Sequence, residues 1–304
     1  PVYILDYFYP HVFCRGKDSE LATIIFPVLY LVIFLGSIML NGLAVWIFFH
    51  IRNKTSFIVY LKNIMIADLL MTVSFPFKII QTSGIGPWNF NVYHCRYSSI
   101  LFYTSMYISI VFLGLISTDR YLKVVKPFGS SKMYNIKFTK VVSLMVWLAM
   151  SFMAMPNVIF TNVQPTRDNI YDCIYTLPKT MYHFKNSTEN TSHCVFNSVI
   201  TSRVLPVFYR TIYKSNQRFK NGSNMKAKSS RNIYSILFVF FVCFVPYHAL
   251  RIPYTLSQVG ADYSCSSKTI LYSMKEVTLL LAASNVCLDP IIYFFMCQPF
   301  RNML

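Results

Sequence analysis

Charged residues are scarce in this chain, and acidic residues are scarcer still. Only 13% of the 304 residues are charged, with 11 Asp and Glu against 28 Lys and Arg. A soluble domain carries about 25% charged residues, so this composition excludes an ordinary water-soluble fold. Hydrophobic residues make up 55% of the chain, and the mean hydropathy is +0.45. This apolar excess has to face something other than water.

Two further absences, and the placement of the basic residues, exclude other classes of protein. None of the 6 His residues has a second His or a Cys at metal-ligand spacing, so neither a metal centre nor a membrane enzyme is indicated. No internal repeat relates two halves of the chain, as is usual in transporters. The net charge of +17 does not indicate nucleic-acid binding, because the basic residues lie in short gaps between apolar runs. Basic residues placed in this way meet anionic lipid and orient a membrane protein.

The apolar residues gather into runs close to the roughly 20 residues that span a hydrocarbon layer. We predict six membrane helices from these runs: Leu21–Phe49, Phe57–Ile80, Cys95–Ile116, Phe138–Phe160, Ile233–Tyr254 and Ile270–Met296. Several runs contain a proline, namely Pro76, Pro156, Pro246 and Pro290. In a membrane, neighbouring groups can bond the carbonyls that a proline frees. We therefore interpret these prolines as kinks rather than breaks.

A seventh span is predicted from charge rather than from hydropathy. The segment between Cys173 and the basic run Arg210–Arg231 has to cross the membrane once more if the gaps rich in Lys and Arg are all to lie on the same side. The candidate, roughly Cys194–Tyr213, is a poor span, because Arg203 near mid-bilayer costs about 2.5 kcal/mol or more. Lys and Arg are concentrated in the first, third and fifth gaps, which indicates that these gaps are cytosolic and the N-terminus extracellular.

The predicted fold class is therefore all-α, a single seven-transmembrane helix bundle over residues 1–304. Residues 1–20 form an extracellular segment, and residues 297–304 begin a cytosolic tail with a short amphipathic eighth helix. Because the chain starts at Pro1 rather than Met, we expect a fragment or a processed form. No signal peptide precedes the first run, so that run would direct insertion. The sequons at Asn186 and Asn190 suit a glycosylated extracellular loop.

The chain has 8 cysteines. With the orientation above, four lie at extracellular ends or in extracellular loops, where disulfides persist: Cys14, Cys95, Cys173 and Cys265. Four cysteines allow three pairings, and sequence alone does not choose among them. The others lie in spans or at the cytosolic end, where we interpret them as small buried hydrophobes.

Ionisable residues inside membrane spans are costly, and so they indicate function. Asp68 lies midway along the second run and Asp289 lies in the last, with Asn41, Ser109 and Asn285 at similar depths. Two carboxylates with neutral oxygens in a dry bundle suit a hard cation such as Na⁺. The alternative is a hydrogen-bonded network without an ion. We expect no other cofactor.

Several motifs fall on the expected spans and sides. Asp119-Arg120-Tyr121 closes the third run, Trp147 lies in the fourth, Phe240-x-x-Cys243-x-x-Pro246-Tyr247-His248 lies in the sixth, and Asp289-Pro290-Ile291-Ile292-Tyr293 lies in the last. Together these motifs resemble those of the rhodopsin-like G-protein-coupled receptors, and the resemblance covers essentially the whole chain. It implies a multi-pass plasma-membrane receptor that activates heterotrimeric G proteins.

The resemblance narrows to the purinergic nucleotide receptors, in the subgroup that responds to ADP or UDP-sugars. The stretches that carry it are Tyr60–Asp68, Met106–Tyr121, Val245–Tyr254 and Lys275–Leu279. Asp289 in place of the commoner Asn before proline is usual for this subgroup, as is Phe244 in place of a Trp. The subgroup implies an inhibitory G protein as partner.

The resemblance also implies roles for individual residues. Arg120 would switch between Asp119 and the G protein, while Tyr209 and Tyr293 would repack as the sixth helix swings out. The implied activation residues are Asp119, Arg120, Tyr121, Tyr209, Phe244, Pro246 and Tyr293. The family's two extracellular disulfides would join Cys95 to Cys173 and Cys14 to Cys265.

The ligand site can be reasoned from the residues themselves. His248 and Arg251 are three positions apart on one predicted helix and share a face, as do Tyr103 and Tyr107, four apart on another. Lys275 opens the last span. Arg and Lys near the outer mouth of an apolar bundle favour a phosphate, and the tyrosines offer hydroxyl donors and a stacking face for a base.

The resemblance places nucleotide contacts at Tyr103, Tyr107, Asn157, His248, Arg251 and Lys275. The alternative is that Arg251 and Lys275 pair with Glu276 or extend outward. The segment Ile174–Pro206 departs from the family pattern, so the ligand is less closely defined than the fold. An orphan or lysophospholipid-type receptor of the same neighbourhood and a non-signalling remnant are the alternative functions. The sequence does not say whether two receptors pair as a dimer.

Overall fold

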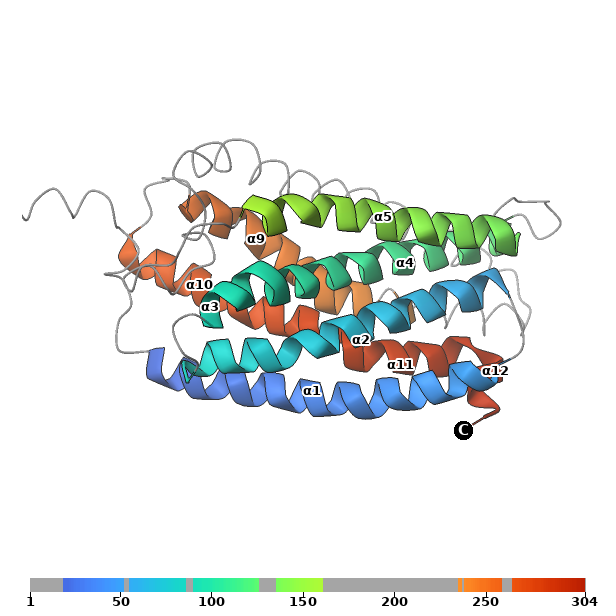
Figure 1. Ribbon diagram of the computed structural model, residues 1–304, viewed down its shortest axis with the longest axis horizontal. Coiled ribbons are helices and arrows are strands. Elements are labelled where there is room, and N and C mark those ends of the chain that lie inside the picture. The colour runs from blue at the N-terminus through green and yellow to red at the C-terminus, as the bar shows by residue number, and fades with distance from the viewer. Residues whose placement is uncertain are drawn as a thin grey trace, which may run out of the picture.

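A computed structural model of the chain describes residues 19–51, 55–85, 90–125, 135–160, 235–236, 238–258 and 264–303. Within these residues every regular element is a helix. The elements are α1 (Ser19–His50), α2 (Ser56–Ser83), α3 (Phe90–Tyr93), η1 (His94–Ser98), α4 (Ser99–Val125), α5 (Ile136–Phe160), η5 (Phe240–Phe244), α9 (Val245–Gln258), α10 (Cys265–Ala283), α11 (Asn285–Met296) and α12 (Gln298–Arg301). Figure 1 shows a bundle with α3 at one end and α12 at the other. These are called below the α3 end and the α12 end.

Five helical segments in the described part of the chain are long and apolar enough to cross a membrane. They are Ile24–His50, Ser56–Ser83, Ser99–Arg120, Ile136–Met155 and Thr269–Met296. They coincide with five of the six runs predicted from hydropathy. The candidate span Cys194–Tyr213 lies outside the described residues.

The remaining run, Ile233–Tyr254, changes helix type along its described part. η5 is a π-helix, and the N–H of Val245 bonds the carbonyl of Phe240, five residues earlier. Pro246 follows directly and has no N–H to continue an α-helical ladder. A π turn beside a proline is a common cause of a helix kink. The described part of this run is helical, as predicted, and the helix type changes next to the predicted kink at Pro246.

The last run is also interrupted, although we predicted a single helix over Ile270–Met296. α10 ends at Ala283 and α11 begins at Asn285, with Ser284 as a turn residue between them. The hydroxyl of Ser284 donates to the carbonyl of Leu281 at 2.7 Å. A serine that bonds a nearby carbonyl competes with the backbone ladder, which accounts for the interruption.

Pro290 inside α11 leaves the carbonyl of Val286 without its helical donor, because proline lacks an N–H. Asn41 on α1 supplies the missing bond, donating from Nδ2 to the Val286 oxygen at 2.8 Å. A neighbouring helix therefore satisfies the carbonyl that the proline frees, as expected inside a membrane.

α2 lies at the centre of the described bundle, packed against α1 and α4 and also contacting α5 and α11. Of its most apolar stretch 61% is buried, against 22% for α1 and 17% for α5. The outer faces of α1 and α5 expose large apolar side chains such as Phe49 and Phe152, a surface suited to lipid. Trp147 on α5 donates from Nε1 to Asn63 on α2 at 2.9 Å, which links a peripheral helix to the centre.

Candidate functional site

An aromatic and cationic cluster lies between α4 and α9. The rings of Tyr103 and Tyr247 stack with centroids 6.4 Å apart, and those of Tyr107 and His248 lie 5.8 Å apart. Arg251 donates from Nη1 to the hydroxyl of Tyr247 at 3.2 Å, and its Cζ lies 5.9 Å from the centre of the Tyr103 ring. The structure therefore brings four of the six predicted nucleotide contacts into one cluster, with Tyr247 at its centre.

Lys275 on α10 is held in a different way from Arg251. Its ammonium forms an ion pair with Glu276, and it lies 5.0 Å and 4.7 Å from the ring centres of Tyr254 and Tyr272. The other carboxylate oxygen of Glu276 lies 3.5 Å from the ammonium of Lys78 on α2. The alternative considered above, pairing with Glu276, is thus what the structure shows for Lys275, whereas Arg251 bonds Tyr247.

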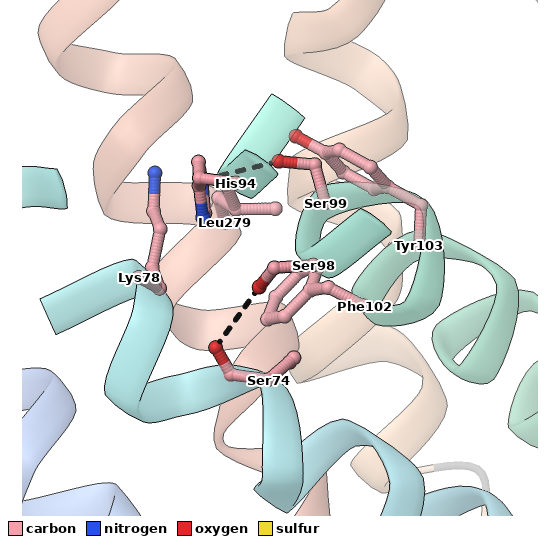
Figure 2. Close-up of a pocket in the computed structure, with 8 residues that line it drawn as sticks. All are labelled: Ser74, Lys78, His94, Ser98, Ser99, Phe102, Tyr103 and Leu279. Carbon is pink, nitrogen blue, oxygen red and sulfur yellow. Dashed lines mark hydrogen bonds between the residues drawn. The ribbon is translucent and has the colours of Figure 1, made fainter. Parts of the chain in front are cut away.

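A small cavity of about 20 Å³ lies beside this cluster, between α2, the start of α4 and α10. Its lining residues are Ser74, Lys78, His94, Ser98, Ser99, Phe102, Tyr103 and Leu279. Figure 2 shows two hydrogen bonds among them: Ser98 Oγ donates to the Ser74 carbonyl at 3.2 Å, and Ser99 Oγ bonds His94 Nε2 at 3.1 Å. Tyr103 belongs both to this cavity and to the aromatic cluster, so the two adjoin.

His94 is buried in the wall of this cavity and lies before the membrane-spanning part of α4, which begins at Ser99. Burial, and then the nearby ammonium of Lys78, lower the pKa of His94 to about 3. Its ring is therefore neutral at physiological pH. A neutral imidazole has one donor and one acceptor nitrogen. Of these two nitrogens, Nδ1 is a buried polar atom with no hydrogen-bond partner among the described residues.

A buried polar network lies among the helices of the bundle. Tyr293 donates to Asp68 Oδ2 at 3.1 Å, and Asn285 Nδ2 donates to Asp289 Oδ2 at 3.4 Å. Asp68 also interacts with Asp289 and with Ser109 on α4. All of these groups are buried.

Four buried oxygens accept no hydrogen bond from any described residue, three in this network and one on Asn41, which bonds α11 at Val286: Asp68 Oδ1, Asn285 Oδ1, Asp289 Oδ1 and Asn41 Oδ1. Buried acceptors without donors are unfavourable unless a cation or water satisfies them. Carbonyl and carboxylate oxygens are the ligands that hard cations prefer, so this donor set fits Na⁺. Among the described residues no group of three or more His, Cys, Asp or Glu could hold a metal ion, and the fit therefore depends on neutral oxygens as well as the two carboxylates.

Arg120 follows Asp119 in the sequence, and the negative charge of the Asp119 carboxylate attracts its guanidinium. Cys297, just before α12, also interacts electrostatically with Arg120. The guanidinium carbon of Arg120 is 3.8 Å from the ring centre of Phe57 on α2. Phe57 was not among the predicted activation residues. In η5, Phe244 is buried, with its ring 6.0 Å from that of Phe240.

Some of the predicted residues cannot be placed. Outside the described residues lie Cys14, Cys173, Asn186, Asn190 and Tyr209, and so do the side chains of Cys95, Tyr121, Asn157 and Cys265. Both predicted disulfides and both glycosylation sites therefore stay predictions. In the described part of the chain, Cys243, Cys287 and Cys297 are free thiols.

Sequence reasoning missed Tyr247, Lys78 and His94. Tyr247 lies four residues before Arg251, so helical spacing could have indicated the contact. Lys78 lies inside the predicted run Phe57–Ile80, and an ionisable residue inside a span indicates function by default. His94 precedes its predicted span by one residue, and no sequence signal singles it out.

Comparison with known proteins gives a match over most of the chain. The family model described as "7 transmembrane receptor (rhodopsin family)" matches residues 40–293. The chain is 54% identical over 296 residues to G-protein coupled receptor 87 of Mus musculus, a match that covers 95% of this chain and 83% of the relative. It is 49% identical over 285 residues to purinoceptor 14 of Bos taurus, with 92% and 84% covered. To purinoceptor 13 of Homo sapiens the identity is 37% over 293 residues, with 95% and 82% covered.

Proposed function

We propose that this chain senses an extracellular nucleotide or nucleotide sugar. The premise is its family: the chain belongs to the rhodopsin family of seven-transmembrane receptors, in its purinergic branch. The ligand class is of the ADP or UDP-glucose type, and the partner is a heterotrimeric G protein of the inhibitory class. The chain is a multi-pass plasma-membrane protein, and its family consists of receptors rather than enzymes.

The observation that carries this proposal is the arrangement around Arg251. Its guanidinium bonds Tyr247 and lies over Tyr103, and no carboxylate is paired with it among the described residues. A guanidinium without a carboxylate partner can bind a phosphate through two parallel hydrogen bonds. The stacked tyrosines around it offer aromatic faces to a nucleobase. Phosphate and base are the two parts that a nucleotide presents.

The proposal includes the topology predicted from charge. The α3 end would be extracellular, together with residues 1–20, and the α12 end cytosolic, with α12 as the start of an amphipathic eighth helix. Arg301 ends α12, and Lys137 and Lys140 lie near the start of α5, which follows the predicted cytosolic third gap, in keeping with the preference of basic residues for the cytosolic side. The disulfides Cys95–Cys173 and Cys14–Cys265, and glycosylation at Asn186 and Asn190, would then lie on the extracellular side.

The central network would hold Na⁺. The unpartnered oxygens of Asn41, Asp68, Asn285 and Asp289 support this. None of them accepts a hydrogen bond from a described residue, and a cation could satisfy them instead. A bound Na⁺ would also offset one of the two carboxylate charges, whose burial side by side is otherwise unfavourable. Its ligands come from α1, α2 and α11.

The proposed function is tested by dose–response curves of G-protein activation for ADP, UDP-glucose and lysophospholipids in cells that express the chain. A response to a nucleotide, lost in pertussis-toxin-treated cells, is the expected result, because this toxin blocks the inhibitory class. A response to lysophospholipid with silence to nucleotides would contradict the proposal. Silence to all three at normal surface expression would indicate a non-signalling receptor.

Arg251 offers a sharper test of the site. Removal of a charged hydrogen-bonding partner costs about 1.5–3 kcal/mol, so Arg251→Ala should lower the potency of the nucleotide by about tenfold or more. Arg301→Ala is the matched control, because it removes the same charge at the other end of the bundle. An unchanged potency in Arg251→Ala would remove Arg251 from the site.

A further inference from the structure

Glu276 holds two ammonium groups at once, and phosphate binding at Arg251 does not explain this arrangement. One of its carboxylate oxygens pairs with Lys275, its neighbour on α10, and the other lies 3.5 Å from the ammonium of Lys78 on α2. The three side chains are between 6% and 14% exposed, so water and salt screen these charges weakly. The group carries two positive charges against one negative charge.

The carboxylate satisfies the two ammonium groups incompletely. Lys275 and Glu276 are adjacent in the sequence, and adjacent residues on a helix do not face each other, so helix geometry does not favour this pair. On the side of Lys78, Glu276 Oε2 is a buried atom with no hydrogen-bond partner among the described residues. A buried oxygen without a donor is unfavourable. The contact is therefore one that a better anion can replace.

A diphosphate is such an anion. It has more acceptor oxygens than a carboxylate, and each of its phosphates carries negative charge, so it supplies at least one negative charge for each ammonium group. It would also be close at hand. Lys275 interacts electrostatically with Tyr103 and Tyr247, the two stacked rings beside Arg251. A diphosphate bound at Arg251 therefore lies near the ammonium of Lys275.

We propose that Glu276 is an autoinhibitory residue, whose carboxylate occupies Lys275 and Lys78 until the phosphate of the ligand displaces it. The inference rests on the proposed nucleotide function and adds a regulation of the same site. Arg251 has no carboxylate partner among the described residues, so it makes the first contact with the phosphate. Displacement of Glu276 follows, and its cost is subtracted from the binding free energy of the ligand.

Glu276→Gln tests the proposal, because it keeps the size of the side chain and removes the competing charge. Dose–response curves of G-protein activation by ADP and by UDP-glucose are compared with those of the wild type at equal surface expression. The EC50 of the active nucleotide should fall about tenfold, since charged contacts no longer have to be broken. Glu20→Gln, which removes the same charge at the start of α1, should leave the EC50 unchanged. An unchanged or raised EC50 in Glu276→Gln would overturn the proposal.

A variant of Lys275 shows whether the gain comes from the lysines. In Lys275→Gln the carboxylate covers one ammonium group fewer, so the addition of Glu276→Gln should lower the EC50 by about threefold or less. A full tenfold gain in this background would mean that Glu276 repels the ligand from a distance, and would contradict the autoinhibitory contact. If Glu276→Gln does not reach the cell surface, Glu276→Asp takes its place. Its shorter side chain withdraws the carboxylate from Lys78, and its EC50 should fall about threefold.

Inorganic pyrophosphate provides a test that does not depend on signalling. It should raise the melting temperature of the detergent-solubilised Glu276→Gln receptor more than that of the wild type, because a ligand stabilises the folded state that binds it. Equal shifts would overturn the role of Glu276. A wild type that responds to neither ADP nor UDP-glucose would overturn the proposed function instead, and the comparison with pyrophosphate would still decide whether Glu276 blocks an anion site.

Discussion

Arg120 packs its guanidinium on the face of Phe57, with 3.8 Å between Cζ and the ring centre. Phe57 is 5% exposed, so the contact is largely shielded from water. A cation over an aromatic ring contributes about 0.5–1 kcal/mol when exposed and about 2 kcal/mol when desolvated. The family resemblance implies that Arg120 switches between Asp119 and the G protein. If it leaves this position to do so, the contact with Phe57 stabilises the resting arrangement.

Substitution of Phe57 should therefore raise basal signalling. Phe57→Leu keeps an apolar side chain but removes the aromatic face, and a loss of about 1 kcal/mol shifts the equilibrium towards activation about fivefold. G-protein activation without agonist, normalised to surface expression, measures this effect. Phe57→Tyr keeps the ring and is the control. If basal activity in Phe57→Leu equals that in Phe57→Tyr, the contact does not restrain Arg120.

At the same scale, the sequence predicts which residues share a helix face but not which of them meet across helices. The three-residue spacing of His248 and Arg251 places both on one face of α9, and both do contact the tyrosine cluster. The stacking of Tyr103 on Tyr247 depends on how deeply α9 is inserted beside α4. That depth is set by helix packing, which no local spacing encodes. The bridge from Lys78 to Glu276 was missed for the same reason.

At the scale of helices, the most informative contact is the bond from Asn41 to the carbonyl of Val286. Pro290 frees this carbonyl, and both Asn41 and Val286 are buried. A buried carbonyl without a donor costs about 1–3 kcal/mol. α11 is therefore stabilised at Pro290 by a side chain from a different helix.

Asn41→Ala should destabilise the folded receptor by about 1–3 kcal/mol, because it leaves the Val286 carbonyl unpaired in a dry environment. A thermal melt of the detergent-solubilised receptor, followed by a thiol-reactive dye or by size-exclusion chromatography, measures the loss. Asn302→Ala in the exposed turn after α12 is the matched control. A melting temperature of Asn41→Ala equal to that of the control would show that the carbonyl finds another donor.

Hydropathy predicts where helices lie and is less able to predict where they break. Five runs correspond to single apolar segments, because about 20 apolar residues in lipid have no alternative to a helix. The interruption at Ser284 and the π turn before Val245 depend on single hydrogen bonds, from the Ser284 hydroxyl and around Pro246. Each such bond contributes about 1 kcal/mol, whereas burial of the whole run contributes far more. A hydropathy value averaged over about 19 residues therefore does not detect these two local changes in the helices.

At the scale of the whole molecule, the central polar network is a feature that links several helices. It joins α1, α2, α4 and α11 through Asn41, Asp68, Ser109 and Tyr293. Tyr293 makes two kinds of contact. Its hydroxyl donates to Asp68, and its ring packs on Phe48 and Phe300 near α12. Movement of α11 would alter both the bond and the packing. An ion bound at this network would therefore favour the arrangement in which these groups converge.

Sodium should accordingly stabilise the receptor in a way that depends on Asp68. A ligand at about ten times its dissociation constant stabilises the state that binds it by about 1.4 kcal/mol, so the melting temperature in NaCl should exceed that in choline chloride at equal ionic strength. Asp68→Asn keeps the shape of the side chain but removes its charge, and it should abolish the difference between the two salts. Asn302→Ala should retain it, because it lies in the turn after α12. Equal melting of the wild type in both salts would mean that Asp68 and Asp289 form the hydrogen-bonded network without an ion, and that a shared proton rather than Na⁺ compensates their burial.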